Sequence, residues 1–165
     1  MLSWGLEGGE TGIQRFRSRF REEGVMASSN LKTIQALHRA FNDRDWEAMA
    51  GPVAESCIWS DARGIEYKGP EAYAKEYAKG WIDAFSDGKI TNPRYYDAGD
   101  TVVAEFVGAG TNDGPLGPMP ATNRKVNVPY CEIFHFDTEG KVIRGSSYFD
   151  MFGLMVQLGH ASPPG

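Results

Sequence analysis

The sequence predicts an α+β domain, because two kinds of hydrophobic spacing divide the chain. Between residues 31 and 85 apolar side chains recur at helical intervals, whereas from Lys89 onward they alternate with a period of two. The alternating stretches predict four strands, at residues 90–96, 101–108, 125–136 and 141–150, followed by a short apolar helix. Helices that precede a run of strands are typical of the α+β class.

The first half of the chain begins with two predicted helices. Ser29 and Asn30 can cap a first helix, which ends near the turn residues Asn42 and Asp43. A second, shorter helix is expected over residues 46–53.

A third helix follows a short strand. Residues 57–59 are expected to form this strand, and residues 60–64 have the composition of a turn. Residues 69–71 open the helix, which ends at residues 87–88. One of its faces carries aromatic side chains that either pack in the core or form one wall of an apolar pocket: Tyr73, Tyr77, Trp81 and Phe85.

Two connections between the strands have different characters. Residues 97–100 contain the Asp and Gly of a tight turn, so the strands on either side are expected to pair as a hairpin. Residues 108–124 are long and rich in Gly and Pro. Such loops inside compact domains are usually functional or disordered. We favour the interpretation that this loop is a lid that covers the mouth of a pocket, rather than a merely solvated loop.

Composition restricts the class of protein. A chain of 165 residues, 41% hydrophobic, suffices for one domain, here residues 26–165. Residues 1–25 differ in composition and are expected to be a disordered extension; they contain too many acidic residues for a transit peptide. The net charge of −5, without a Lys/Arg cluster, argues against nucleic acid or membrane as partner. No apolar run is long enough to span a bilayer.

The two cysteines, Cys57 and Cys131, lie far apart and lack the spacing of metal ligands. We therefore expect no metal site, no disulfide and a reducing, cytoplasmic location.

Glu132 is the most conspicuous polar residue of the predicted strands. Alternation places it on the same strand face as Tyr130, Phe134 and Phe136, with Cys131 and its alternating neighbours opposite. If the aromatic face is the inner one, Glu132 is buried, and burial should raise its pKa.

Several stretches together resemble the nuclear transport factor 2-like superfamily: the helix pair, the strand carrying WSDA, the helix after GPEAY and the run of long strands. The segment GTNDGPLGPMPATNRKVNVPYCEIFHFDTEGKVIRGSSYFDMFGLMVQLG is similar to SnoaL-like polyketide cyclases, and the resemblance covers about residues 30–160. It implies a cystatin-like α+β barrel of curved sheet and three helices around a cone-shaped pocket. It further implies a cofactor-independent enzyme that forms a homodimer through its exposed sheet face.

The resemblance also suggests residues for a site. The acid/base Asp of these cyclases falls on Ser147, their strand His falls on Glu132, and a recurring Asp is retained as Asp150. In the related ketosteroid isomerases the general-base Asp corresponds to Asp61 and the protonated oxyanion-hole Asp to Glu132. The isomerases' helix Tyr falls on Leu37.

These residues suit enolisation of an apolar carbonyl compound, by cyclisation or isomerisation, with Asp61 as base and Glu132 as protonated donor to the enolate oxygen. Asp150 completes the catalytic set. The expected substrate-binding residues are Trp59, Tyr77, Trp81, Tyr130, Phe134, Ser147 and Phe149.

Alternatives remain for each assignment. Asp61 can instead organise its turn or pair with Arg63, and Glu132 can form a structural hydrogen bond. His38 shares the apolar stripe of the first helix and is interpreted as a core residue, while His135 faces away from Glu132. At the level of function, the alternatives are a non-catalytic binding or dimerisation module and epoxide opening by activated water.

Overall fold

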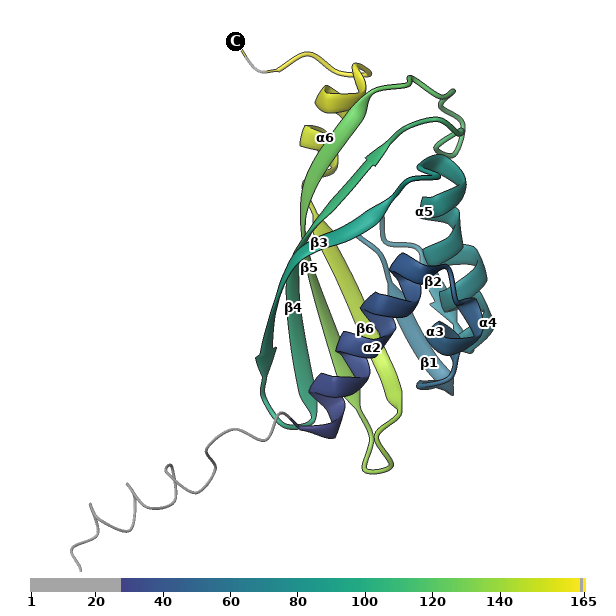
Figure 1. Cartoon of the computed structure of the whole chain (residues 1–165), viewed down its shortest axis with the longest axis vertical. Coiled ribbons are helices and arrows are strands. Elements are labelled where there is room, and N and C mark those ends of the chain that lie inside the picture. The colour runs from purple at the N-terminus through teal and green to yellow at the C-terminus, as the bar shows by residue number, and fades with distance from the viewer. Residues whose placement is uncertain (1–27, 164) are drawn as a thin grey trace, which may run out of the picture.

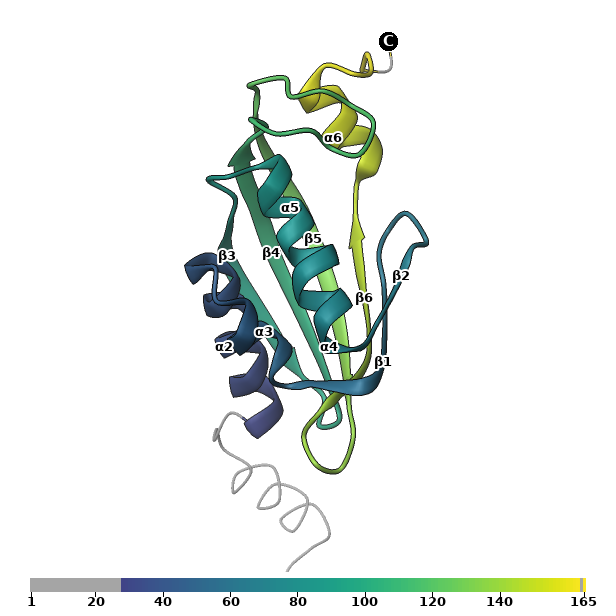
Figure 2. The same ribbon diagram turned by 90° about the vertical axis from the view of Figure 1, so that its right-hand side faces the viewer.

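The structure is a computed structural model that describes residues 28–163 and residue 165 (Figure 1). The extension predicted for residues 1–25 lies outside these described residues. Within them, a single mixed sheet carries helices on one side, as expected for the α+β class (Figure 2). No helix of the described part of the chain is long and apolar enough to cross a membrane.

The sheet has six strands in the order β2-β1-β6-β5-β4-β3. Their bounds are β1 Val53–Ser60, β2 Glu66–Lys68, β3 Lys89–Asp97, β4 Thr101–Thr111, β5 Lys125–Phe136 and β6 Val142–Phe149. Neighbouring strands are antiparallel except β1 and β6, which run parallel. The order has two open ends, at β2 and β3, so the sheet is open rather than a closed barrel.

The four strands predicted in the second half and the hairpin between β3 and β4 are confirmed. The alternation predicted for β5 is also confirmed, because Glu132, Phe134 and Phe136 are buried and the residues between them are partly exposed. The short strand β2 is an addition to the predicted elements.

Helices pack against the inner face of the sheet. Their bounds are α2 Ser29–Asp43, α3 Trp46–Ala50, α4 Gly69–Glu71, η1 Ala72–Ala78, α5 Lys79–Ala84 and α6 Met151–Leu158. Ser28 caps α2 by accepting a hydrogen bond from the Leu31 amide at 3.1 Å, one residue before the predicted caps. The predicted third helix is the continuous run α4–η1–α5, whose middle is a π-helix. In Figure 2 this run lies in front of β4 and β5, with α2 beside β3.

Packing in the core holds the α4–η1–α5 run on the sheet. Trp59 on β1 is fully buried and meets Tyr73 and Tyr77 of η1 at ring-centroid distances of 4.9 and 5.4 Å. Its indole lies over Gly145 of β6, where a Cβ atom would collide with the ring. The small residue on β6 therefore admits the indole that positions η1 on the sheet.

The long loop between β4 and β5 is firmly anchored. Asn112 is fully buried, donates to the carbonyl oxygens of Ala84 and Gly114 at 3.1 and 2.8 Å, and accepts from the Thr122 amide at 2.9 Å. Leu116 packs against a second hydrophobic cluster that contains residues of α6. These contacts fix the loop at the end of the sheet near α5 and α6 (Figure 1).

Candidate active site

A cavity lies between α2, the η1–α5 run and the inner face of the sheet. The volume within it that is open to the centres of water-sized spheres is about 80 Å³. Most of its wall is aliphatic or aromatic, including Leu37, Phe41, Trp81, Phe85, Phe106 and Leu154. Residues 112–124, all of which the structure describes, do not line it, so the long loop supports the wall from behind.

A carboxylate and an imidazole face each other in this cavity. Glu132 comes from the middle of β5, where it pairs with Ala104 and Ser147 on the neighbouring strands, and His38 comes from α2. Nε2 of His38 lies 3.2 Å from Oε2 of Glu132. Both residues line the cavity and are almost wholly buried, at 3% and 5% exposure. A buried carboxylate needs such partners, because an isolated charge is costly in an apolar interior.

Phenol groups complete the polar end of the cavity. Tyr77 donates to Oε1 of Glu132 at 3.3 Å. Burial, and next the negative charge of Glu132, raise the pKa of Tyr73, Tyr77 and Tyr130, all of which line the cavity. These three phenols therefore stay protonated at neutral pH and can donate hydrogen bonds to a ligand.

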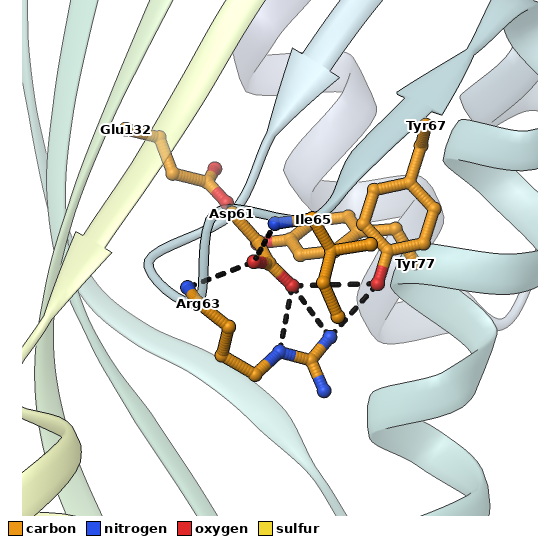
Figure 3. A network of polar contacts seen from close by, with 6 residues as sticks. All are labelled: Asp61, Arg63, Ile65, Tyr67, Tyr77 and Glu132. Carbon is orange, nitrogen blue, oxygen red and sulfur yellow. Dashed lines mark hydrogen bonds and ion pairs between the residues drawn. The ribbon is translucent and has the colours of Figure 1, made fainter.

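Asp61 occupies a separate network in the turn after β1 (Figure 3). Its carboxylate accepts from the amides of Arg63 and Ile65 at 2.8 and 3.1 Å. Nε of Arg63 donates to it at 2.7 Å, and the Tyr67 hydroxyl at 3.3 Å. Asp61 does not line the cavity. The geometry thus favours the alternative in which Asp61 organises its turn and pairs with Arg63.

The other predicted site residues fall into two groups. Tyr77, Trp81 and Tyr130 line the cavity together with Glu132. The remainder do not line it: Trp59 and Phe134 are fully buried in the core, Ser147 is buried opposite Glu132, Phe149 stacks on Tyr130, and Asp150 caps α6 through the Gly153 amide.

The partner of Glu132 is not among the site residues predicted from the sequence. The prediction that His38 is a core residue is confirmed, because its side chain is buried and both ring nitrogens have partners. The sequence did not predict that one of these partners is Glu132. Tyr95 on β3, whose hydroxyl lies 3.0 Å from Nδ1 of His38, was not singled out either. Periodicity places each residue on its element but does not say which helix position docks on which strand.

The fold is similar to those of several solved structures. A candidate SnoaL-like polyketide cyclase from Jannaschia sp. CCS1 superposes with a TM-score of 0.73 at 20% identity, covering 86% of this chain and 100% of that one. IdmH, a candidate polyketide cyclase from Streptomyces antibioticus, gives 0.68 at 20% identity, covering 80% and 99%. A protein with a ketosteroid isomerase-like fold from Catenulispora acidiphila gives 0.66 at 18% identity, covering 79% and 97%.

The sequence identifies the family. Residues 32–158 match the SnoaL-like polyketide cyclase family, and the chain belongs to it. No curated protein matches the sequence. The family and the fold agree with the resemblance found in the sequence.

Proposed function

We propose that this protein is an acid–base enzyme that enolises an apolar carbonyl compound, as a cyclase or isomerase, without a cofactor. The observation that carries the proposal is the buried Glu132–His38 pair facing a largely apolar cavity. A site of this kind binds a largely apolar molecule and presents one base to it.

Glu132 is the proposed base. Its carboxylate removes a proton from the carbon next to the carbonyl group, and the negative charge that develops on the carbonyl oxygen meets a protonated phenol. Tyr130 is the proposed donor, because it lines the cavity, whereas the single hydroxyl proton of Tyr77 is already donated to Glu132. One such donor contributes about 3–4 kcal/mol to the transition state, and general acid–base catalysis about 10²–10⁴-fold. His38 holds the carboxylate in place.

This assignment moves the base from Asp61 to Glu132. Arg63, Ile65 and Tyr67 hold the Asp61 carboxylate within its turn, and Asp61 does not line the cavity. Glu132 has the access that a base requires.

A second candidate function is a non-catalytic binding module. Ser147 supports it, because the resemblance to the cyclases implies that their acid/base Asp falls on this position. Such a module would use the same cavity and the same apolar ligands.

Glu132→Gln separates the two functions. The variant keeps the shape of the side chain and removes its basicity. We expect hydrogen–deuterium exchange at the α-carbon of an aromatic ketone such as 2-tetralone, followed by proton NMR in D₂O, to fall by about 10²-fold or more, with ligand affinity little changed. An unaltered exchange rate in the variant, or no exchange above buffer by the wild type across a panel of polycyclic ketones, would favour the binding module.

A further inference from the structure

The hydrogen bonds at Glu132 continue toward the protein surface. His38 contacts Glu132 through Nε2 at 3.2 Å and the hydroxyl of Tyr95 through Nδ1 at 3.0 Å. Tyr95 belongs to β3, which is one of the two edge strands of the sheet, and it is only partly buried. The line of polar groups therefore joins the deep end of the cavity to a partly exposed side chain.

We propose that Glu132, His38 and Tyr95 form a proton relay between the cavity and solvent. The relay rests on the proposed function, because it carries outward the proton that Glu132 takes from the ligand. An apolar ligand that fills the cavity displaces water from it, so the carboxylate needs another route for its proton. The imidazole between Glu132 and Tyr95 supplies that route, because its two ring nitrogens can each donate or accept.

The proton balance is simple. After Glu132 has taken a proton from the ligand, its carboxyl group donates to Nε2 of His38. At the same time Nδ1–H of His38 donates to the oxygen of Tyr95, and the Tyr95 hydroxyl donates to water. One proton then shifts along each of these three hydrogen bonds. Glu132 becomes a carboxylate that accepts from Nε2–H, the Tyr95 hydroxyl now donates to Nδ1, and water has gained one proton. No bond between heavy atoms changes.

Tyr95 suits the outer position of the relay. Burial raises the pKa of its phenol, so the group keeps its proton and can donate as well as accept. Its neighbour Tyr96 provides a matched control, because it is exposed and its hydroxyl donates to Glu105 at 2.9 Å, outside the relay.

The first test uses the ligand-free protein with ¹⁵N-labelled histidine. The quantity measured is the rate at which the ring N–H of His38 exchanges its hydrogen with solvent. Because His38 is buried, we expect Tyr95→Phe to slow this exchange about tenfold and Tyr96→Phe to leave it at the wild-type rate. An equal or faster exchange in Tyr95→Phe would overturn the relay.

The second test separates the relay from the proposed function. With 2-tetralone in D₂O, we expect Tyr95→Phe to lower deuterium incorporation at the α-carbon about tenfold at unchanged affinity, and Tyr96→Phe to have no effect. Equal incorporation by the wild type and Tyr95→Phe would overturn the relay and leave the proposed function intact. If the wild type catalyses no deuterium incorporation into any ketone, the proposed function fails. The ring N–H exchange of His38 then still decides whether the relay conducts protons.

Discussion

Asp61 shows, at the scale of one residue, how a buried carboxylate can be held in place by hydrogen bonds within its own turn. Its side chain is fully buried against Arg63, while the Arg63 side chain is 37% exposed. The carboxylate also accepts two amide hydrogen bonds, from Arg63 and Ile65. Hydrogen bonds to a charged group are stronger than neutral ones, and losing them leaves buried donors unsatisfied.

Asp61→Asn should therefore act on stability. The amide replaces one acceptor oxygen with a donor that faces the guanidinium of Arg63. We expect the free energy of unfolding to fall by about 1–3 kcal/mol in a urea titration, the lower end reflecting the exposure of Arg63. Unchanged stability together with lost turnover would return Asp61 to the role of base.

The difference between Glu132 and His38 shows which parts of a site local spacing can predict. The inward direction of Glu132 follows from strand alternation, which is a property of consecutive residues. The contact with His38 spans 94 positions of sequence and depends on how α2 docks on the sheet. For the same reason Tyr95 is recognisable as part of the site only once β3 and α2 are side by side.

At the scale of elements, the parallel pairing of β1 and β6 depends on one close approach. Gly145 faces Trp59 in the register of the two strands, and the indole fills the space that a Cβ atom would take. Because Trp59 also packs on Tyr73 and Tyr77, this pairing sets the position of η1 and of one cavity wall.

Gly145→Ala should consequently destabilise the protein. Overpacking a well-filled core typically costs about 1–3 kcal/mol, and we expect a loss in this range by urea unfolding. Gly80→Ala in α5 is the matched control, since nothing lies near the new methyl group there, and alanine favours a helix by about 0.5–1 kcal/mol over glycine. A neutral Gly145→Ala would contradict the packing described for Trp59.

A second element, the turn between α5 and β3, is tied to the end of β4. Asp87 accepts from the amide and hydroxyl of Thr111 at 2.6 and 2.8 Å, and these bonds lower the pKa of its carboxyl. A carboxyl whose pKa is lower in the folded state stabilises the fold above its unfolded pKa, near 3.8, and loses that contribution as the pH falls through the folded pKa.

Asp87→Asn tests this pH dependence. Solvent screens the exposed group, so we expect the free energy of unfolding to fall by about 0.5 kcal/mol at pH 7. The loss should be smaller at pH 3, because the wild-type carboxyl is also becoming protonated there. Thermal unfolding of both proteins at the two pH values measures it. If the wild type and Asp87→Asn differ in stability by the same amount at both pH values, the charge of Asp87 does not contribute to stability.

The elements also differ in how well the sequence predicts them. Long alternating strands such as β5 and the stripe of α2 were predicted because each carries several periods of its pattern. β2 is only three residues long and carries no complete pattern. The π-helical form of η1 was missed because its aromatic spacing of four residues is also compatible with an α-helix.

At the scale of the whole molecule, the outer face of the sheet carries exposed apolar side chains. Ile58 on β1 and Tyr148 on β6 are 37% and 55% exposed, and each alternates with an inward residue. We propose that two copies pair through this face, as the family resemblance implies.

Light scattering tests the dimer. At micromolar concentration we expect twice the mass of one chain, and Tyr148→Glu should weaken association, because it places a charge within the proposed interface. A wild-type monomer under these conditions would contradict the proposal.

The central claim is that Glu132, and not Asp61, removes the proton from the ligand. The most direct measurement is the rate of α-hydrogen exchange of 2-tetralone in D₂O, compared at equal ligand saturation for the wild type, Glu132→Gln and Asp61→Asn. The account predicts that Glu132→Gln falls by about 10²-fold or more, while folded Asp61→Asn stays near the wild-type rate. Loss of exchange in Asp61→Asn with normal exchange in Glu132→Gln would contradict it.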